Sequence, residues 1–281
     1  MKTVRIIPRL DIKGPNLVKG IHLEGLRVLG KPADFAKYYY EQGADELMFM
    51  DVVASLYGRN SLQEIVSETA KSIFIPITVG GGIRTLSDIT NMLRAGADKV
   101  SINTAAINDP SFIKKASEEF GSSTIVIAIE AIKNIDGKYY AFTDNGREHT
   151  GVEVVEWAKR VEDLGCGELV VTSVDNEGTG KGFNVDLISS IASVVSIPVI
   201  AHGGAGQKSD VESLLDDGIV DAVAIASVLH YDTIKYLEAN TNNQVEGNFD
   251  FLKSGRLFGN FSTFNLKDLK EYLHLKDIYC R

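Results

Sequence analysis

The feature that most constrains this chain is a stretch of sequence that occurs twice, about half the chain apart. The run "IPITVGGGIRTLSDI" at residues 75–89 returns as "IPVIAHGGAGQKSDV" at 197–211. Each copy leads into a second matching run, "ADKVSINTA" at 97–105 and "VDAVAIASV" at 220–228. One shared Gly-Gly pair would be chance, but a long parallel pattern is not. The repeat predicts two halves with the same local structure.

Short apolar, β-branched runs alternate with amphipathic helical patterns along the chain, which is typical of a parallel sheet covered by helices. The helical patterns include residues 32–44, 60–73 and 85–97, the last with Thr85 and Asp88 as an expected N-terminal cap. Eight runs are expected strands: residues 4–11, 46–52, 75–80, 99–103, 124–130, 168–173, 199–201 and 222–226. Together with the repeat, they predict a single (βα)8 TIM barrel made of two (βα)4 half-barrels. The alternative is a doubly wound open sheet.

The length of 281 residues suits one α/β barrel, and no Pro/Gly/Ser-rich linker divides the chain. We therefore expect one domain over residues 1–281, with half-barrels at about 1–120 and 121–235. Residues 134–151 are predicted to form a hairpin after the fifth strand. The polar, Asn-rich stretch at about 236–264 is predicted to be a surface insertion, and about 265–275 a closing helix.

Charge and cysteine content exclude several classes of protein. The net charge of −9 argues against a nucleic-acid binder. The two cysteines, Cys166 and Cys280, are too few for a disulfide framework or a zinc site. The chain has neither a signal peptide nor an apolar run long enough to span a membrane, so we expect a cytoplasmic protein. Nothing in the sequence indicates a metal or an organic cofactor.

The repeated glycines are expected at the mouth of the barrel, where the carboxyl ends of the strands carry the active site. Glycine lets backbone N–H groups approach an anion closely, and a following helix N-terminus adds a favourable dipole. Each half thus predicts a phosphate cup: Gly81, Gly82, Asn103 and Thr104 in the first, and Gly203, Gly204, Ala226 and Ser227 in the second. The alternative is that these glycines only make strand–helix turns. Two cups predict a ligand with a phosphate at each end.

Two carboxylates are expected to converge on the same mouth. Asp11 ends the first expected strand and Glu130 ends the fifth. Strands one and five face each other across an eight-stranded ring, so the pair suits proton delivery and removal on opposite faces of one substrate. For Asp11 the alternative is a capping or salt-bridging aspartate.

These motifs resemble the cyclase subunit family of imidazole glycerol phosphate synthase, an enzyme of histidine biosynthesis. The resemblance covers about residues 1–231 and resumes weakly at 265. The runs that carry it are "RIIPRLDIK", "LVKG", "ADELMFMDVVAS", "TVGGGI", "GADKVSINTAA", "FGSSTIVIAIEA", "TSVDNEGTGKG", "HGGAG" and "AIASVLH". It implies a lyase that takes ammonia from a glutaminase subunit, its partner in a heterodimer. The bisphosphorylated phosphoribulosyl-formimino-carboxamide nucleotide (phosphoribulosyl-formimino-AICAR) would be converted to imidazole glycerol phosphate and the aminoimidazole carboxamide ribonucleotide, AICAR.

The resemblance also implies roles for single residues. Asp11 matches a general acid/base, Lys19 a mobile substrate-gripping lysine and Asp51 a supporting carboxylate. Gly178 and Thr179 fall in a phosphate-side run. Four charges at the starts of strands match a gate through which ammonia enters: Arg5, Glu46, Lys99 and Glu168. Asp98 matches a residue that faces the glutaminase.

Several positions near the mouth depart from the family pattern. Glu130 stands where aspartate is the second acid/base, Arg9 where cysteine is usual and Glu177 where aspartate is usual; His202 precedes the second Gly-Gly pair. These departures favour an alternative, a paralogue that delivers ammonia to a sugar amidotransferase of surface-glycan biosynthesis. Two further alternatives are the related sugar-phosphate isomerase, which needs no ammonia, and a non-catalytic activator of a glutaminase.

Overall fold

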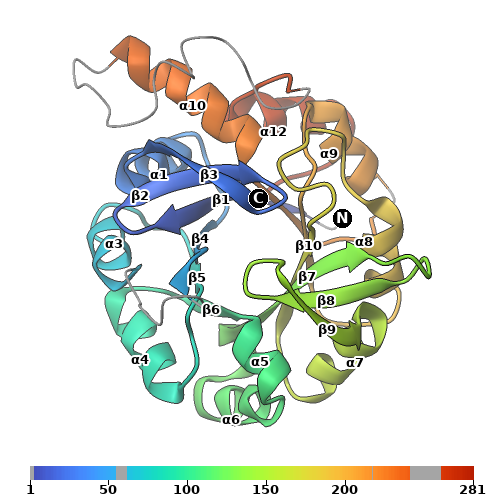
Figure 1. The fold of residues 1–281 in the computed structure, drawn as a ribbon. Helices are drawn as coiled ribbons and strands as arrows, with labels where there is room; N and C mark the ends of the chain where they lie inside the picture. Colours follow the sequence, from blue (N-terminus) through green and yellow to red (C-terminus); the bar gives the residue numbers. More distant parts are fainter. Residues whose placement is uncertain (1–2, 55–61, 217, 241–260) are drawn as a thin grey trace.

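The computed structural model describes residues 3–54, 62–216, 218–240 and 261–281. Eight parallel strands close into a barrel (Figure 1). They are β1 (Arg5–Lys13), β4 (Leu47–Asp51), β5 (Ile77–Gly80), β6 (Lys99–Ile102), β7 (Ile125–Lys133), β10 (Glu168–Ser173), β11 (Val199–His202) and β12 (Ala222–Ile225). Each lies at one of the eight runs expected to be a strand. Because β7 pairs with β10 and β12 with β1, the ring is closed, and the open-sheet alternative is wrong.

Helices surround the barrel as an outer ring (Figure 1). They are α1 (Pro32–Glu41), α3 (Leu62–Thr69), α4 (Leu86–Ala95), α5 (Thr104–Asn108), α6 (Ser111–Phe120), α7 (Val154–Asp163), α8 (Val185–Ala192), α9 (Lys208–Leu215), α10 (Ser227–Asn240) and α12 (Leu266–His274). Helix α12 lies where a closing helix was expected. Helix α10 runs through the first residues of the expected insertion, and residues 241–260 lie outside the described residues.

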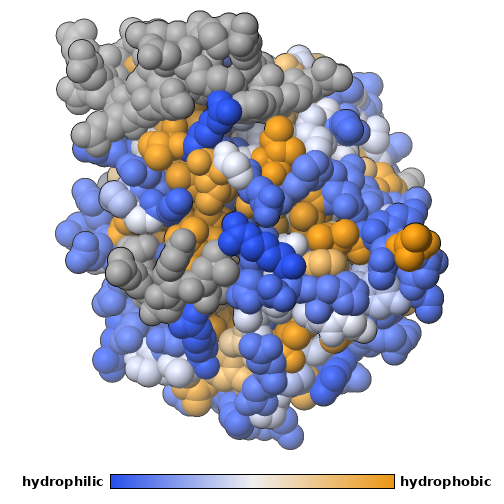
Figure 2. All heavy atoms as spheres, viewed as in Figure 1, coloured by the Kyte–Doolittle hydropathy of each residue, from blue (hydrophilic) through white to orange (hydrophobic). Residues whose placement is uncertain are grey.

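Two hairpins extend strands of the barrel at its carboxyl end (Figure 1). β8 (Tyr139–Thr143) and β9 (Glu148–Glu153) continue from β7 and confirm the hairpin expected within 134–151. β2 (Asn16–Ile21) and β3 (Glu24–Gly30) continue from β1 and were not expected. Hydrophilic side chains predominate around the edge of the face seen in Figure 1, and apolar ones show between them (Figure 2).

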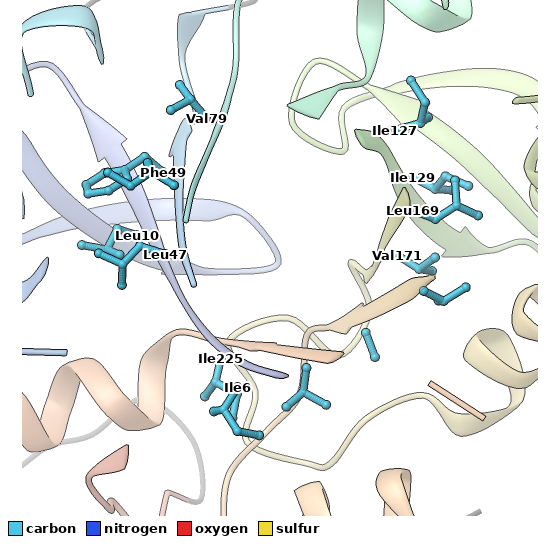
Figure 3. Close-up of a cluster of buried hydrophobic side chains, with 14 of the residues drawn as sticks. Ile6, Leu10, Leu47, Phe49, Val79, Ile127, Ile129, Leu169, Val171 and Ile225 are labelled. Carbon is cyan, nitrogen blue, oxygen red and sulfur yellow. The ribbon is translucent and has the colours of Figure 1, made fainter. Parts of the chain in front are cut away.

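Strand side chains alternate between two apolar cores, because successive residues of a strand point to opposite faces. Ile6, Leu10 and Phe49 belong to the core between the strands and the helices (Figure 3). Ile7 and Met48 belong to a second core inside the barrel. On β1, the residues that alternate with Ile7 on the inward face are polar: Arg5 towards the start of the strand, and Arg9 and Asp11 towards its end. They belong to two polar sites, one at each end of the barrel.

The sequence repeat corresponds to repeated local structure. Helix α4 starts with a capping box in which Thr85 accepts from the backbone of Asp88 and the Asp88 carboxylate accepts from the backbone of Thr85, which confirms the expected cap. At the start of helix α9, the Asp210 carboxylate likewise accepts from the backbone N–H of Gln207, and it also accepts from the side-chain amide of Gln207. In both halves, the helix after the Gly-Gly pair thus starts with an aspartate carboxylate that caps a backbone N–H.

The capping box gives a test of local stability. Asp88→Ala leaves the N–H of Thr85 without its acceptor, so we expect the free energy of unfolding to fall by about 1 kcal/mol in urea titrations. Ser87→Ala is the control, because Ser87 is an exposed neighbour in the same turn. Equal losses in the two variants would contradict a specific contribution from the cap.

Candidate active site at the mouth of the barrel

Asp11 on β1 and Glu130 on β7 approach the mouth from opposite sides. Strand β7 is reached from β1 through three intervening strands in either direction around the ring. Both side chains are buried, with 1% of Asp11 and 9% of Glu130 exposed. The opposed carboxylates expected from the sequence are therefore present.

The Asp11 carboxylate is held by two cations. Its Oδ1 accepts from Arg9 Nε and its Oδ2 from Lys19 Nζ, each at 2.9 Å. Burial alone would raise the pKa of Asp11, but the charges of Arg9 and Lys19 outweigh burial and lower the pKa well below its usual range. Asp11 is consequently ionised at neutral pH, with both oxygens engaged.

Arg9 reaches across β12 to the neighbouring strands. Its Nη1 lies 3.3 Å from Thr172 Oγ1 on β10 and 3.1 Å from His202 Nδ1 on β11. The interior side chain of β12 at this level is Ala224, which is small enough to leave room for the guanidinium. Burial, together with the charge of Arg9, lowers the pKa of His202 well below its ordinary value, so the imidazole is neutral. Arg9 is thus part of the site.

Glu130 lies in a different environment from Asp11. Its Oε2 accepts from the backbone N–H of Gly146, in the turn between β8 and β9, at 2.8 Å. Burial raises the pKa of Glu130 to about 7, although the charge of Arg9 and the bond from Gly146 act in the opposite direction. At neutral pH, Glu130 therefore exists in both protonated and ionised forms.

The first expected cup opens beside Glu130. A cavity of about 300 Å³ is lined by residues from β1 and from β4 to β7, including the expected site residues Asp51, Gly81, Gly82, Asn103, Thr104 and Glu130. Gly81 has a φ of +97°, and a Cβ there would lie 2.2 Å from the carbonyl oxygen of Asp51. Only glycine fits this turn, which leaves its backbone N–H groups close to the cavity.

The second expected cup lies on the other side of the mouth. Gly178, Gly203, Gly204, Ala226 and Ser227 line one small hollow together with Glu177 and His202. Gly203 and Gly204 have positive φ angles, as Gly81 and Gly82 do. Thr179 does not line this hollow: its hydroxyl donates to the carbonyl oxygen of Asn176 at 2.7 Å.

Glu177, which lines the second cup, binds the β2–β3 hairpin through two contacts. Glu177 forms an ion pair with Lys19, and its Oε2 accepts from the backbone N–H of Leu23 at 2.9 Å. Lys19, expected in a mobile loop, is on β2 and only 4% exposed. Asn145, which lies within the stretch expected to form the hairpin after the fifth strand, donates to the Leu23 carbonyl at 2.8 Å and joins the two hairpins.

The opposite end of the barrel holds a ring of four charges: Arg5, Glu46, Lys99 and Glu168. Arg5 and Lys99 each pair with both glutamates, and Glu46 also accepts from Thr78 Oγ1 at 2.5 Å. Thr78 was not expected in this ring, because it carries no charge. Asp98 is exposed beside the start of β5 and accepts from the backbone N–H of Ile77 at 2.8 Å.

Within the described parts of the chain, no helix has the length and apolar character needed to cross a membrane. The same residues contain no group of three or more His, Cys, Asp or Glu side chains suited to hold a metal ion. Asp11 and Glu46 lie instead against arginine, in the pairs Asp11–Arg9 and Glu46–Arg5.

Comparison with known proteins agrees with this geometry. Residues 5–235 match the family described as "Histidine biosynthesis protein". The imidazole glycerol phosphate synthase subunit HisF of Legionella pneumophila is 58% identical over 210 residues, which cover 75% of this chain and 99% of that protein. The chain belongs to the HisF family. The HisF subunit of Prochlorococcus marinus (strain AS9601) is 46% identical over 243 residues, 86% of this chain and 95% of its own length. That of an Exiguobacterium species is 49% identical over 226 residues, 80% and 88% of the two chains.

Glu130 makes the stability of this HisF family member depend on pH. Its folded-state pKa of about 7 lies above its ordinary value of 4.5. The resulting stabilisation is fully present below the unfolded-state pKa and is lost as the pH rises through 7. Relative to Glu130→Gln, we expect the free energy of unfolding to fall by about 3 kcal/mol between about pH 4 and pH 8. A difference between the two proteins that is constant with pH in urea titrations would contradict this expectation.

Proposed function

We propose that this chain is the cyclase subunit of an imidazole glycerol phosphate synthase and acts as a lyase in histidine biosynthesis. Its relatives carry this name, and the chain spans nearly the whole length of two of them. The observation that carries the proposal is the placement of two opposed carboxylates, Asp11 and Glu130, between two glycine-lined cups. The reaction would join ammonia to the phosphoribulosyl-formimino-AICAR nucleotide and release imidazole glycerol phosphate and AICAR.

The two cups suit the two phosphates of that substrate. Each cup offers backbone N–H groups at a glycine pair and the start of a helix, α5 after Asn103 or α10 after Ala226. Such groups attract an anion locally, so the net charge of −9 does not oppose binding. A phosphate in each cup would stretch the substrate across the mouth and bring its centre between Asp11 and Glu130.

The different environments of the two carboxylates support different roles in proton transfer. Asp11 is ionised and can accept a proton or stabilise a developing positive charge. Glu130 titrates near neutrality and can both donate and accept. Ring closure and C–N cleavage need protons added and removed on opposite faces of the substrate, and this pair supplies both faces. Lys19, fixed between Asp11 and Glu177, is suited to grip the substrate from the hairpin.

The opposite end of the barrel is suited to receive ammonia from a glutaminase subunit in a heterodimer. The relatives are named as subunits of a synthase, which implies an assembly. Between the charged ring and the mouth, the interior is lined by apolar side chains such as Ile7, Met48 and Val170. Such a lining admits neutral ammonia and disfavours a charged ion. We expect the partner to dock on the face that carries Asp98, and the complex to be cytoplasmic.

The chemistry of the barrel can be tested without a partner. With ammonium salt as the nitrogen source, we expect the purified chain to convert the formimino nucleotide. We expect Asp11→Asn and Glu130→Gln each to lower kcat about 100-fold or more, because each removes a proton-transferring group. Asp163→Asn, the same change at an exposed residue of α7, should have no effect. No turnover by the unmodified chain would overturn the proposal and favour the alternative of ammonia delivery to another amidating enzyme.

The charged ring gives a separate test of ammonia entry. Lys99→Met leaves Glu46 and Glu168 paired only with Arg5. With a glutaminase partner and glutamine, we expect severalfold less product per glutamine hydrolysed, whereas turnover with ammonium salt is unchanged. Lys114→Met, at an exposed position of α6, is the control. Equal losses with both nitrogen sources would instead assign the ring a purely structural role.

A further inference from the structure

We propose that Arg9 is a positioning residue that acts through both carboxylates: it clamps Asp11 on one side of the barrel and places its buried positive charge in the cavity that Glu130 lines on the other. The catalytic consequence rests on the proposed function. The electrostatic part concerns only side chains of this chain and can be tested without any substrate.

The clamp follows from the contacts of the guanidinium. Arg9 is 3% exposed and uses Nε for Asp11, while Nη1 is directed to Thr172 and His202. Three strands, β1, β10 and β11, therefore fix its orientation. A planar guanidinium serves several partners at once in a way that a lysine ammonium cannot. The other charged groups facing Asp11 are Lys19 from β2 and, through Lys19, Glu177 from the loop after β10.

The influence on Glu130 follows from the surroundings of the cavity. Among the described residues, the charged ones that line it are Arg9, Asp51, Arg84, Asp109 and Glu130. Of the two cations in that set, Arg84 is exposed and donates to the backbone of Ala54, whereas Arg9 is buried. Asp144, in the turn after β8, disfavours the ionised form of Glu130, while the side chain of Asn103, between β6 and α5, favours it. Arg9 is thus the buried positive charge that opposes the effects of burial and Asp144.

The arrangement also links the ionisation of Glu130 to Arg9. A glutamate buried at this position would stay protonated without a nearby cation, because burial disfavours its charged form. Arg9 supplies that cation within the same cavity. Its cost of burial is offset by Asp11, which is ionised for the same reason. Arg9 and Glu130 are therefore expected to function as a pair.

The direct test is a titration of Glu130 by carbon-13 NMR of glutamate-labelled protein without substrate, with the resonance assigned by its loss in Glu130→Gln. In Arg9→Met, which keeps the length but not the charge, we expect the midpoint to rise by about one unit or more. Arg9→Lys keeps the charge and should shift it less. Arg94→Met, at an exposed residue in the last turn of α4, should not shift it. An unchanged midpoint in Arg9→Met overturns the proposal, and Arg9→Gln serves as the neutral variant if Arg9→Met does not fold.

Kinetics with ammonium salt test the catalytic consequence. We expect Arg9→Met to lower kcat more than it changes KM. The limb of the kcat–pH profile that Glu130→Gln abolishes should move to higher pH. In a Glu130→Gln background, Arg9→Met should lower kcat by a smaller factor than in the unmodified protein, because the two residues act together. If Arg9→Met lowers kcat by the same factor in both backgrounds, the pairing is overturned. Absence of turnover in the unmodified chain overturns the proposed function instead, and the NMR titration then still decides the electrostatic part.

Discussion

The pairing of β7 with β10 closes the barrel, and this one ladder determines what the inward-facing side chains meet. Its register sets Thr172 opposite Glu130 at the mouth. At the other end of β10, it sets Glu168, a member of the ring of four charges, opposite Val126. Because the barrel is closed, the sheet has no edge exposed to solvent between these strands. Every second residue of each strand points into an interior that side chains fill. Polar groups there have to satisfy one another or lie at the two ends. The active-site mouth and the charged ring are consequences of this requirement.

Charged side chains are buried at both polar sites, but they are compensated in different ways. At the ring, two cations and two glutamates pair in a closed set in which each charge has two opposite partners. At the mouth, the set is lopsided: Asp11 takes two cations, and Glu130 takes a backbone N–H. Charges that are all paired favour one fixed arrangement. A carboxyl group whose pKa is raised mainly by burial can instead gain and lose a proton near neutral pH. This unequal pairing of the two carboxylates is what suits the mouth to proton transfer.

Local patterns in the sequence were sufficient for the eight barrel strands, the capping box at Thr85 and the glycine pairs, because these depend on residues near one another in the chain. The burial of Lys19 was not predictable, since it depends on Glu177, which lies on another loop. The contact of Asn145 was not predictable, because its partner, the Leu23 carbonyl, belongs to an unexpected hairpin. Thr179 was expected on the phosphate side from its position in a family motif, and only the structure shows that its hydroxyl donates to Asn176. The contacts of Lys19 and Asn145 were missed because they join loops from different strands, whereas that of Thr179 depends on how its own loop is folded.

The turn of the β2–β3 hairpin places His22 and Leu23 at φ angles of +53° and +62°, a region that costs a non-glycine residue on the order of 1 kcal/mol. An Asn-Gly pair would make the same turn with less strain. The present residues are held by Glu177 and Asn145, and Leu23 is buried among them. The hairpin is therefore not a transferable module. Grafted onto another barrel without those two partners, it would lose the contacts that offset its strained backbone, so it must be exchanged together with the loops that it touches.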